Sequence, residues 1–116
     1  MKVVYVIGPF RGKTTWDVVL NCRNAEALGL EVAKRGAMPL IPHNNTKNFD
    51  GLLEEEFWVD GTRELLRRSD AAITVAAIGL RWEHSRGSIG EVHEMDRLVR
   101  PVFHALPDLE SWLKSF

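Results

Sequence analysis

The chain of 116 residues has little of several features that mark specialised protein classes. It has one cysteine, Cys22, so no disulfide can form within the chain and a disulfide-stapled fold is excluded. No apolar run reaches the roughly 20 residues that a membrane-spanning helix needs. The opening "MKVVYVI" runs directly into a glycine turn, so we expect neither a signal peptide nor a membrane anchor. The net charge of -1 argues against a general nucleic-acid binder.

The remaining composition fits one ordinary globular domain. Hydrophobic residues make up 45% of the chain and charged residues 27%, both usual for a soluble protein. The length suffices for one hydrophobic core and is too short for two. The histidines and the lone cysteine show no metal-ligand spacing, so we expect no metal site. We therefore expect a single cytoplasmic domain over residues 1–116.

Short apolar runs alternate with segments of helical periodicity. Strands are expected at Val3–Ile7, Ala37–Ile41, 71–77 and 100–105. Helices are expected at 16–35, at 52–70 with a break at Gly61, at 88–98 and at 106–116, and a loop at 43–51. This order predicts an α/β fold with a doubly wound, flavodoxin- or Rossmann-like, mostly parallel sheet of four to five strands. Ligands of such sheets bind beyond the carboxyl ends of the strands, where this chain is polar and glycine-rich.

The segment "GPFRGKT", residues 8–14, resembles a phosphate-binding P-loop. A P-loop has four residues between its two glycines, whereas Gly8 and Gly12 enclose three, of which Pro9 lacks an N–H group. The expected strand at 71–77 also ends in no carboxylate that would hold Mg²⁺. We therefore do not expect a nucleoside-triphosphate clamp, and we interpret "GKT" as solvated.

The same segment still offers groups suited to a nucleotide. Gly8 and Gly12 allow a ligand to approach the backbone closely. Arg11 presents a planar guanidinium to a phosphate, and Phe10 presents a ring on which a base can stack.

A second group of small residues occurs where a helix is expected to begin, namely Ser85, Gly87, Ser88 and Gly90. The free N–H groups of a helix start bind anions. Two interpretations remain open. The letters "SIGE", ending at Glu91, match an S-x-x-E capping box, which needs only helix stability as its purpose. Two glycines in the first turns, however, lower the helix propensity and favour a ligand at the backbone.

In order along the chain, "YVIGPFRG", "PH" after the second strand, "LLRRSDAAITV" and "SRGSIGE" resemble the nucleoside 2-deoxyribosyltransferase superfamily. The closest branch is that of the 2'-deoxynucleoside 5'-monophosphate N-hydrolases, and the resemblance runs from residue 5 to about residue 103. It implies a doubly wound parallel sheet, a small-molecule nucleotide substrate and no metal or organic cofactor. It also implies a homodimer or higher homo-oligomer, in which a neighbouring subunit helps to close the pocket.

The resemblance further implies roles for single residues. Glu91 is the nucleophile that attacks the anomeric carbon and forms a covalent glycosyl ester, and Tyr5 contacts and orients it. Phosphate is implied at Arg11, Ser85, Gly87 and Ser88, with Gly8 and Gly12 at the same turn. The base is implied beside Phe10 and Trp58, with His43 on the sugar or base side. Transferases of free nucleosides carry an aspartate where this chain has Ser85, so the resemblance favours a monophosphate substrate.

The chain departs from the superfamily at one position. An aspartate usually lies eight residues before the one that corresponds to Asp70 and assists the leaving base, but this chain has Thr62 there. Asp60, two residues earlier, is the candidate replacement. Two alternatives therefore stay open: a nucleoside 2-deoxyribosyltransferase that acts on free nucleosides, and a non-catalytic nucleotide-binding module.

Overall fold

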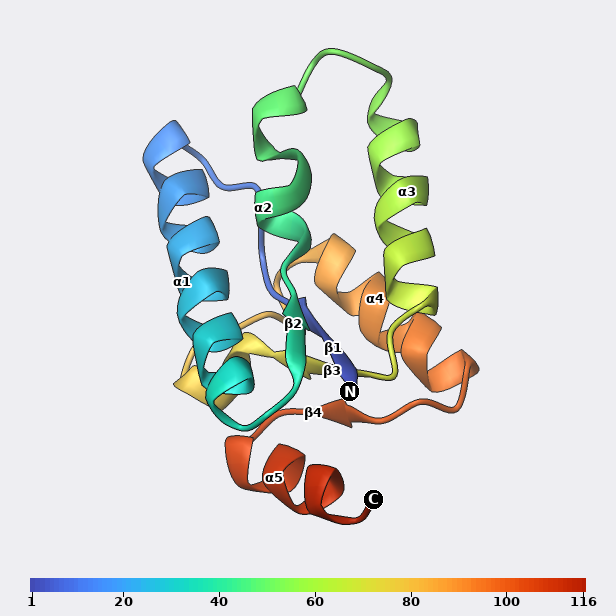
Figure 1. The fold of residues 1–116 in the computed structure, drawn as a ribbon. Helices are drawn as coiled ribbons and strands as arrows, with labels where there is room; N and C mark the ends of the chain where they lie inside the picture. The colour runs from blue at the N-terminus through green and yellow to red at the C-terminus, as the bar shows by residue number, and fades with distance from the viewer.

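The protein, seen in a computed structural model that describes residues 1–116, has a parallel four-stranded sheet with helices on both faces (Figure 1). The strands are β1 (Val3–Ile7), β2 (Met38–Leu40), β3 (Ala71–Thr74) and β4 (Val102–Phe103), in the order β2-β1-β3-β4. The helices are α1 (Thr15–Lys34), α2 (Pro42–Thr46), α3 (Glu55–Arg67), α4 (Arg86–Arg97) and α5 (Leu106–Lys114), with short 3-10 helices η1 (Lys47–Phe49) and η2 (Val75–Ile78). The predicted α/β, doubly wound sheet is confirmed. None of the helices combines the length and hydrophobicity needed to cross a bilayer.

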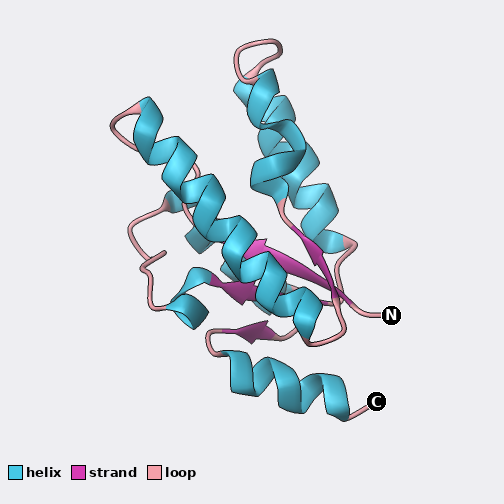
Figure 2. Ribbon diagram, turned by 60° about the vertical axis from the view of Figure 1, so that its left-hand side comes forward, coloured by secondary structure: helices cyan, strands magenta, loops and turns pink.

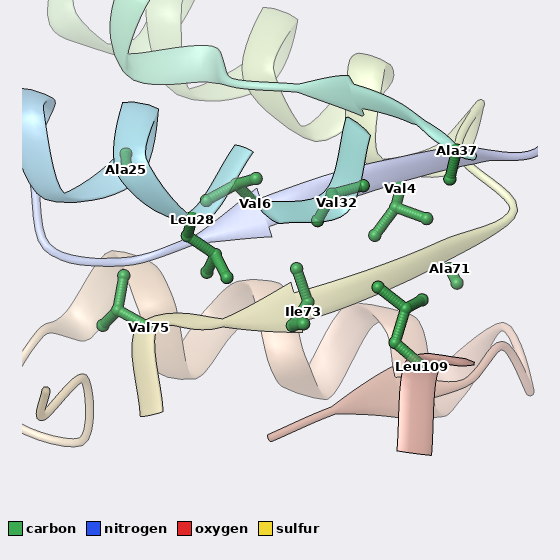
Figure 3. Close-up of a cluster of buried hydrophobic side chains, with 10 residues drawn as sticks. All are labelled: Val4, Val6, Ala25, Leu28, Val32, Ala37, Ala71, Ile73, Val75 and Leu109. Carbon is green, nitrogen blue, oxygen red and sulfur yellow. The ribbon is translucent and has the colours of Figure 1, made fainter. Parts of the chain in front are cut away.

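Alternation along the strands gives the sheet two apolar faces. One face packs under α1 and α5 and forms a cluster around Val4, Val6, Leu28, Ile73 and Leu109 (Figure 3). In Figure 2 α1 crosses this face of the sheet and α5 lies below β4. The other face packs against α3 and α4 through a second cluster, which consists of Tyr5, Ile7, Leu66, Ala72, Val92 and Met95. Tyr5 therefore points toward the layer that contains α4.

The strand order reverses at β1, which lies between β2 and β3. The chain leaves β1 for β2 on one side and returns to β3 on the other, and Ile7 pairs with Thr74 at the carboxyl ends of these two strands. In sheets of this kind the crevice at the reversal binds ligands, because the two connections diverge to opposite faces and leave the strand ends uncovered.

Three expectations about element boundaries are wrong. The segment 43–51, expected as a loop, contains most of α2 and all of η1, because Pro42 starts a short helix with its preset φ. The helix α3 runs through Gly61 without a break. The expected strand 71–77 ends at Thr74, η2 begins at Val75, and that 3-10 helix is capped by Gly79 with a φ of 79°.

The start of α4 also differs from the expectation. Ser85 is the N-cap, and its hydroxyl accepts a hydrogen bond of 3.2 Å from the Ser88 backbone N–H. Ser88 therefore lies inside the helix, and the capping-box interpretation of "SIGE" is wrong. Because the helix begins two residues earlier than expected, Glu91 lies in its second turn rather than its first.

Candidate active site

A cavity of about 540 Å³ opens at the carboxyl ends of the central strands. It is lined by the turn after β1, the α2–η1 segment after β2, one face of α3, and the loop and first turns of α4 that follow β3. Its volume lies within the range of about 300–1,000 Å³ that is usual for small-molecule sites. No group of three or more His, Cys, Asp or Glu side chains in the chain is arranged to hold a metal ion.

Most of the residues predicted from the sequence meet in this cavity, namely Gly8, Phe10, Arg11, His43, Trp58, Ser85, Gly87, Ser88 and Glu91. Tyr5 lies behind the wall, fully buried, and reaches the cavity only through Glu91. Asp60 is exposed and does not line the cavity, whereas Thr62 does.

Gly12 also lies outside the cavity, and its neighbours show which structure the segment "GKT" forms. A Cβ atom at Gly12 would collide with the side chain of Asp17. Thr14 and Asp17 form a capping box at the start of α1. The stretch that resembles a P-loop is therefore a helix start, and Gly12 is required by the approach of Asp17.

Tyr5, which is fully buried, and Glu91, which is partly exposed, form a polar pair at the site. The Tyr5 hydroxyl donates a hydrogen bond to Oε2 of Glu91. Burial raises the pKa of Glu91 to about 7, although the Tyr5 hydrogen bond and the charge of Arg63 act in the opposite direction. Glu91 lies in the second turn of α4, away from the free N–H groups of the helix start, and the loss of water around it has the largest effect on its pKa.

Arg11 is held by two carboxylates at the cavity. Its Nη2 lies 2.9 Å from Oδ1 of Asp50, and its Nε lies 3.1 Å from Oε1 of Glu55. The hydrogen bond from Arg11 lowers the pKa of Asp50, so this carboxylate is ionised at neutral pH. A phosphate at Arg11 would have to compete with these two partners for the guanidinium.

His43 connects α2 to the turn after β1. Its Nε2 lies 3.1 Å from the Gly8 carbonyl oxygen and 2.9 Å from that of Pro9. Because carbonyl oxygens only accept hydrogen bonds, Nε2 carries the proton and donates it. Burial lowers the pKa of His43, so the ring is neutral and its Nδ1 is an acceptor.

Three buried side-chain atoms in the chain have no hydrogen-bond partner: Nδ1 of His43, Nε1 of Trp58 and Oγ of Ser88. All three side chains line the cavity, although they come from three different helices. Buried polar groups are nearly always paired in native proteins. Their concentration at this one place favours a polar ligand there.

The start of α4 supplies the part of the cavity best suited to an anion. The first N–H groups of a helix have no partner within it. A Cβ atom at Gly87 would meet nothing within 4 Å, so the space beside that backbone is open. Arg86, which the sequence reasoning passed over although it lies inside the "SRGSIGE" motif, adds a positive charge at this end of the cavity.

Several further cavity residues were also missed, and the local sequence held little signal for them. Glu55 belongs to a run of acids typical of a solvated first helical turn, but it binds Arg11. Asp50 lies in a segment expected to be a loop. Arg63 lies on α3, and its guanidinium packs against Gly90 of α4. These contacts depend on how α2, α3 and α4 meet, which no short motif encodes.

The cavity thus combines a partly buried carboxylate held by a tyrosine, a helix start open to anions, and aromatic rings. These groups suit the displacement of a leaving group from an anionic organic substrate. No known protein family, curated protein or solved structure matches the chain.

Proposed function

We propose that the protein is an N-glycosidase that hydrolyses the base–sugar bond of a 2'-deoxynucleoside 5'-monophosphate. The observation that carries this proposal is the Tyr5–Glu91 hydrogen bond at the wall of the cavity. The tyrosine hydroxyl fixes one carboxylate oxygen, which leaves the other free to attack a carbon atom in the cavity. The proposed reaction agrees with the sequence motifs that resemble the nucleoside 2-deoxyribosyltransferase superfamily.

In the proposed reaction, Glu91 attacks the anomeric carbon as the carbon–nitrogen bond breaks, and the bonding electron pair leaves with the base. The transition state resembles an oxocarbenium ion and collapses to a glycosyl ester of Glu91. Water then hydrolyses the ester and releases deoxyribose 5-phosphate. The phosphate lies at the start of α4, beside Ser85 and Arg86, and the base lies toward Phe10 and Trp58.

A nucleoside 2-deoxyribosyltransferase is the second candidate function, and one observation favours it. Asp50 and Glu55 both line the cavity and already neutralise Arg11. Two carboxylates at the site repel a phosphate and tolerate a free 5'-hydroxyl group. In that case a second base, rather than water, would take the sugar from Glu91.

The proposal includes a second copy of the chain beside the cavity and a cytoplasmic location. Large apolar side chains are exposed around the start of α3, namely Phe49, Leu52, Leu53, Phe57 and Val59. Large exposed apolar side chains that lie near one another in the chain favour a protein–protein contact.

The proposed cytoplasmic location rests on Cys22, a free, buried thiol, as in proteins of a reducing compartment.

A nucleotide panel tests the proposed function directly. We expect the protein to release free base from at least one 2'-deoxynucleoside 5'-monophosphate, measured by chromatography, and to release less from the matching nucleoside. Base exchange between nucleosides in the presence of an added free base would identify the transferase instead. Binding of monophosphates without any base release would contradict both reactions and would leave a nucleotide-binding module.

The pH dependence of kcat/KM follows from the pKa of Glu91. The nucleophile must be ionised, and its pKa is raised to about 7. We therefore expect kcat/KM to fall about tenfold per pH unit below about pH 7 and to level off above it. The second ionisation of the substrate phosphate, near pH 6, adds a separate and lower inflection. A profile that is flat from pH 5.5 to 8 would contradict a carboxylate nucleophile with a raised pKa.

A further inference from the structure

Arg63 is an arginine of the cavity that no protein side chain engages. It lines the same cavity as Arg11, but Arg11 is ion-paired with Asp50 and Glu55, whereas Arg63 forms no ion pair and no side-chain hydrogen bond. A guanidinium offers five N–H donors and accepts none. The donors of Arg63 are therefore available to a molecule in the cavity.

Gly90 provides the space that this guanidinium occupies. A Cβ atom at Gly90 would collide with Nη2 of Arg63 and would lie 3.4 Å from its Cζ. Gly90 lies inside α4, where glycine lowers helix stability relative to alanine. The glycine thus weakens the helix at the one point where Arg63 from α3 packs on it.

The charge of Arg63 reaches the reacting pair. Burial raises the pKa of Glu91 and the pKa of Tyr5, and the charge of Arg63 lowers both. The guanidinium packs on the turn of α4 that carries Glu91, close enough for its charge to act on the carboxylate without an ion pair. A cation in this position can act on charge that develops as the glycosidic bond breaks.

The cavity offers few other groups that assist a departing base. A base that leaves with the bonding electron pair needs a proton or a positive charge near it. Asp50 and Glu55 accept hydrogen bonds from Arg11, and Asp50 is kept ionised. His43 directs its proton to the backbone carbonyls of the turn after β1. Two other ionisable side chains line the cavity, His84 and Arg86; both are exposed, and Arg86 lies at the start of α4, where the phosphate is proposed to bind.

On the basis of the proposed N-glycosidase activity, we infer that Arg63 is a catalytic residue that receives the departing base as an anion. Its guanidinium donates hydrogen bonds to the acceptor beside the glycosidic nitrogen, which is O2 of a pyrimidine or N3 of a purine. The bond from C1' to a Glu91 oxygen forms, the C1'–N bond breaks, and its electron pair stays on the base. Arg63 keeps its proton, and the base takes one from the water that hydrolyses the ester.

Two substitutions test this role from opposite sides of the contact. Arg63→Met removes the guanidinium and keeps much of its bulk. Gly90→Ala keeps Arg63 but pushes its guanidinium aside, and it raises helix propensity. We expect Arg63→Met to lower kcat by about 10²- to 10³-fold, as the loss of a transition-state donor does, with KM changed less than about threefold. We expect Gly90→Ala to lower kcat at least about tenfold while the midpoint of urea unfolding stays or rises.

The leaving group supplies a readout that a structural role would not change. The measurement is the rate at which free base is released. The probes are the 5'-monophosphates of deoxyuridine, 5-fluorodeoxyuridine, deoxyadenosine, deoxyguanosine and deoxycytidine. The fluorinated base is the more stable anion, so Arg63→Met should slow its release several-fold less than that of uracil. Arg63→Lys, which keeps the charge, should retain an intermediate rate.

Each other result overturns the inference. An unchanged kcat in Arg63→Met or in Gly90→Ala shows that the guanidinium does not act on the base. Equal losses for uracil and 5-fluorouracil show that it does not stabilise the anion. If His84→Gln rather than Arg63→Met produces the difference between these bases, then His84 is the assisting group. Failure of the wild-type protein to release any base would overturn the proposed function together with this inference.

Discussion

Glu91→Gln is expected to lower base release from deoxynucleoside monophosphates by at least about 10⁴-fold, because the amide keeps the shape of the side chain but removes the nucleophile. Substrate binding should survive, since the amide oxygen can still accept the hydrogen bond that the Tyr5 hydroxyl donates to Glu91. The measurement is kcat for released base, together with the dissociation constant of the same monophosphate. A large loss of kcat with a nearly constant dissociation constant is the pattern of a group that acts in the transition state.

Asp60→Asn is the matched control, since it also replaces one carboxylate by an amide and lies on α3, a helix that lines the cavity through other residues. Asp60 is exposed and lies outside the cavity, so we expect its kcat within about twofold of wild type. Turnover by Glu91→Gln at a rate close to wild type would contradict the covalent mechanism. A strong loss in Asp60→Asn would instead assign the leaving-group acid to that residue.

The same substitution, Glu91→Gln, should stabilise the folded protein at high pH. The pKa of Glu91 is about 7 in the fold against 4.5 for an ordinary glutamate, so the folded state holds this proton more tightly than the unfolded state. At about 1.4 kcal/mol per pH unit, this interval corresponds to about 3 kcal/mol of lost stability once Glu91 is ionised. The glutamine variant carries no charge to bury and escapes this loss.

The upward direction of the Glu91 pKa shift determines the pH range in which the stabilities of the two proteins differ. Below about pH 4.5 the carboxyl is protonated in both states and the two proteins should differ little. The wild type then loses stability relative to the variant as the pH rises to about 7, and the difference stays constant above that. Urea unfolding should therefore give a gap below about 1 kcal/mol at pH 5 and of about 3 kcal/mol at pH 8. Glu56 is exposed, so Glu56→Gln should show no such difference in stability from wild type at either pH. Glu91→Gln less stable than wild type at pH 8 would contradict the burial of this charge.

A higher free energy of unfolding in Glu91→Gln would indicate that Glu91 is kept for its function at a cost in stability. Folding places Glu91 in the partly buried wall of the cavity, and the two hydrophobic clusters on the faces of the sheet offset the loss. Substitutions at active sites often stabilise a protein for this reason.

Much of the architecture was predictable from local patterns. The β-branched run Val3–Ile7 forms β1 as expected, and the small residues around Ser85 do mark the start of a helix at the edge of the sheet where the cavity opens. The predicted meeting of Phe10, Arg11 and Glu91 in one cavity is likewise found. These predictions succeeded because strand ends in a parallel sheet meet at one edge whatever the details of packing.

The sequence by itself determined the order of strands and helices, and therefore which polar segments share an edge of the sheet. Only the tertiary structure decided that Arg11 is engaged by Asp50 and Glu55, that Thr62 rather than Asp60 lines the cavity, and that Arg63 packs on Gly90 beside Glu91. Periodicity records which face of an element is buried, whereas the partner of a charge and the pKa of a carboxylate depend on groups brought close from distant parts of the chain and on the water that they displace.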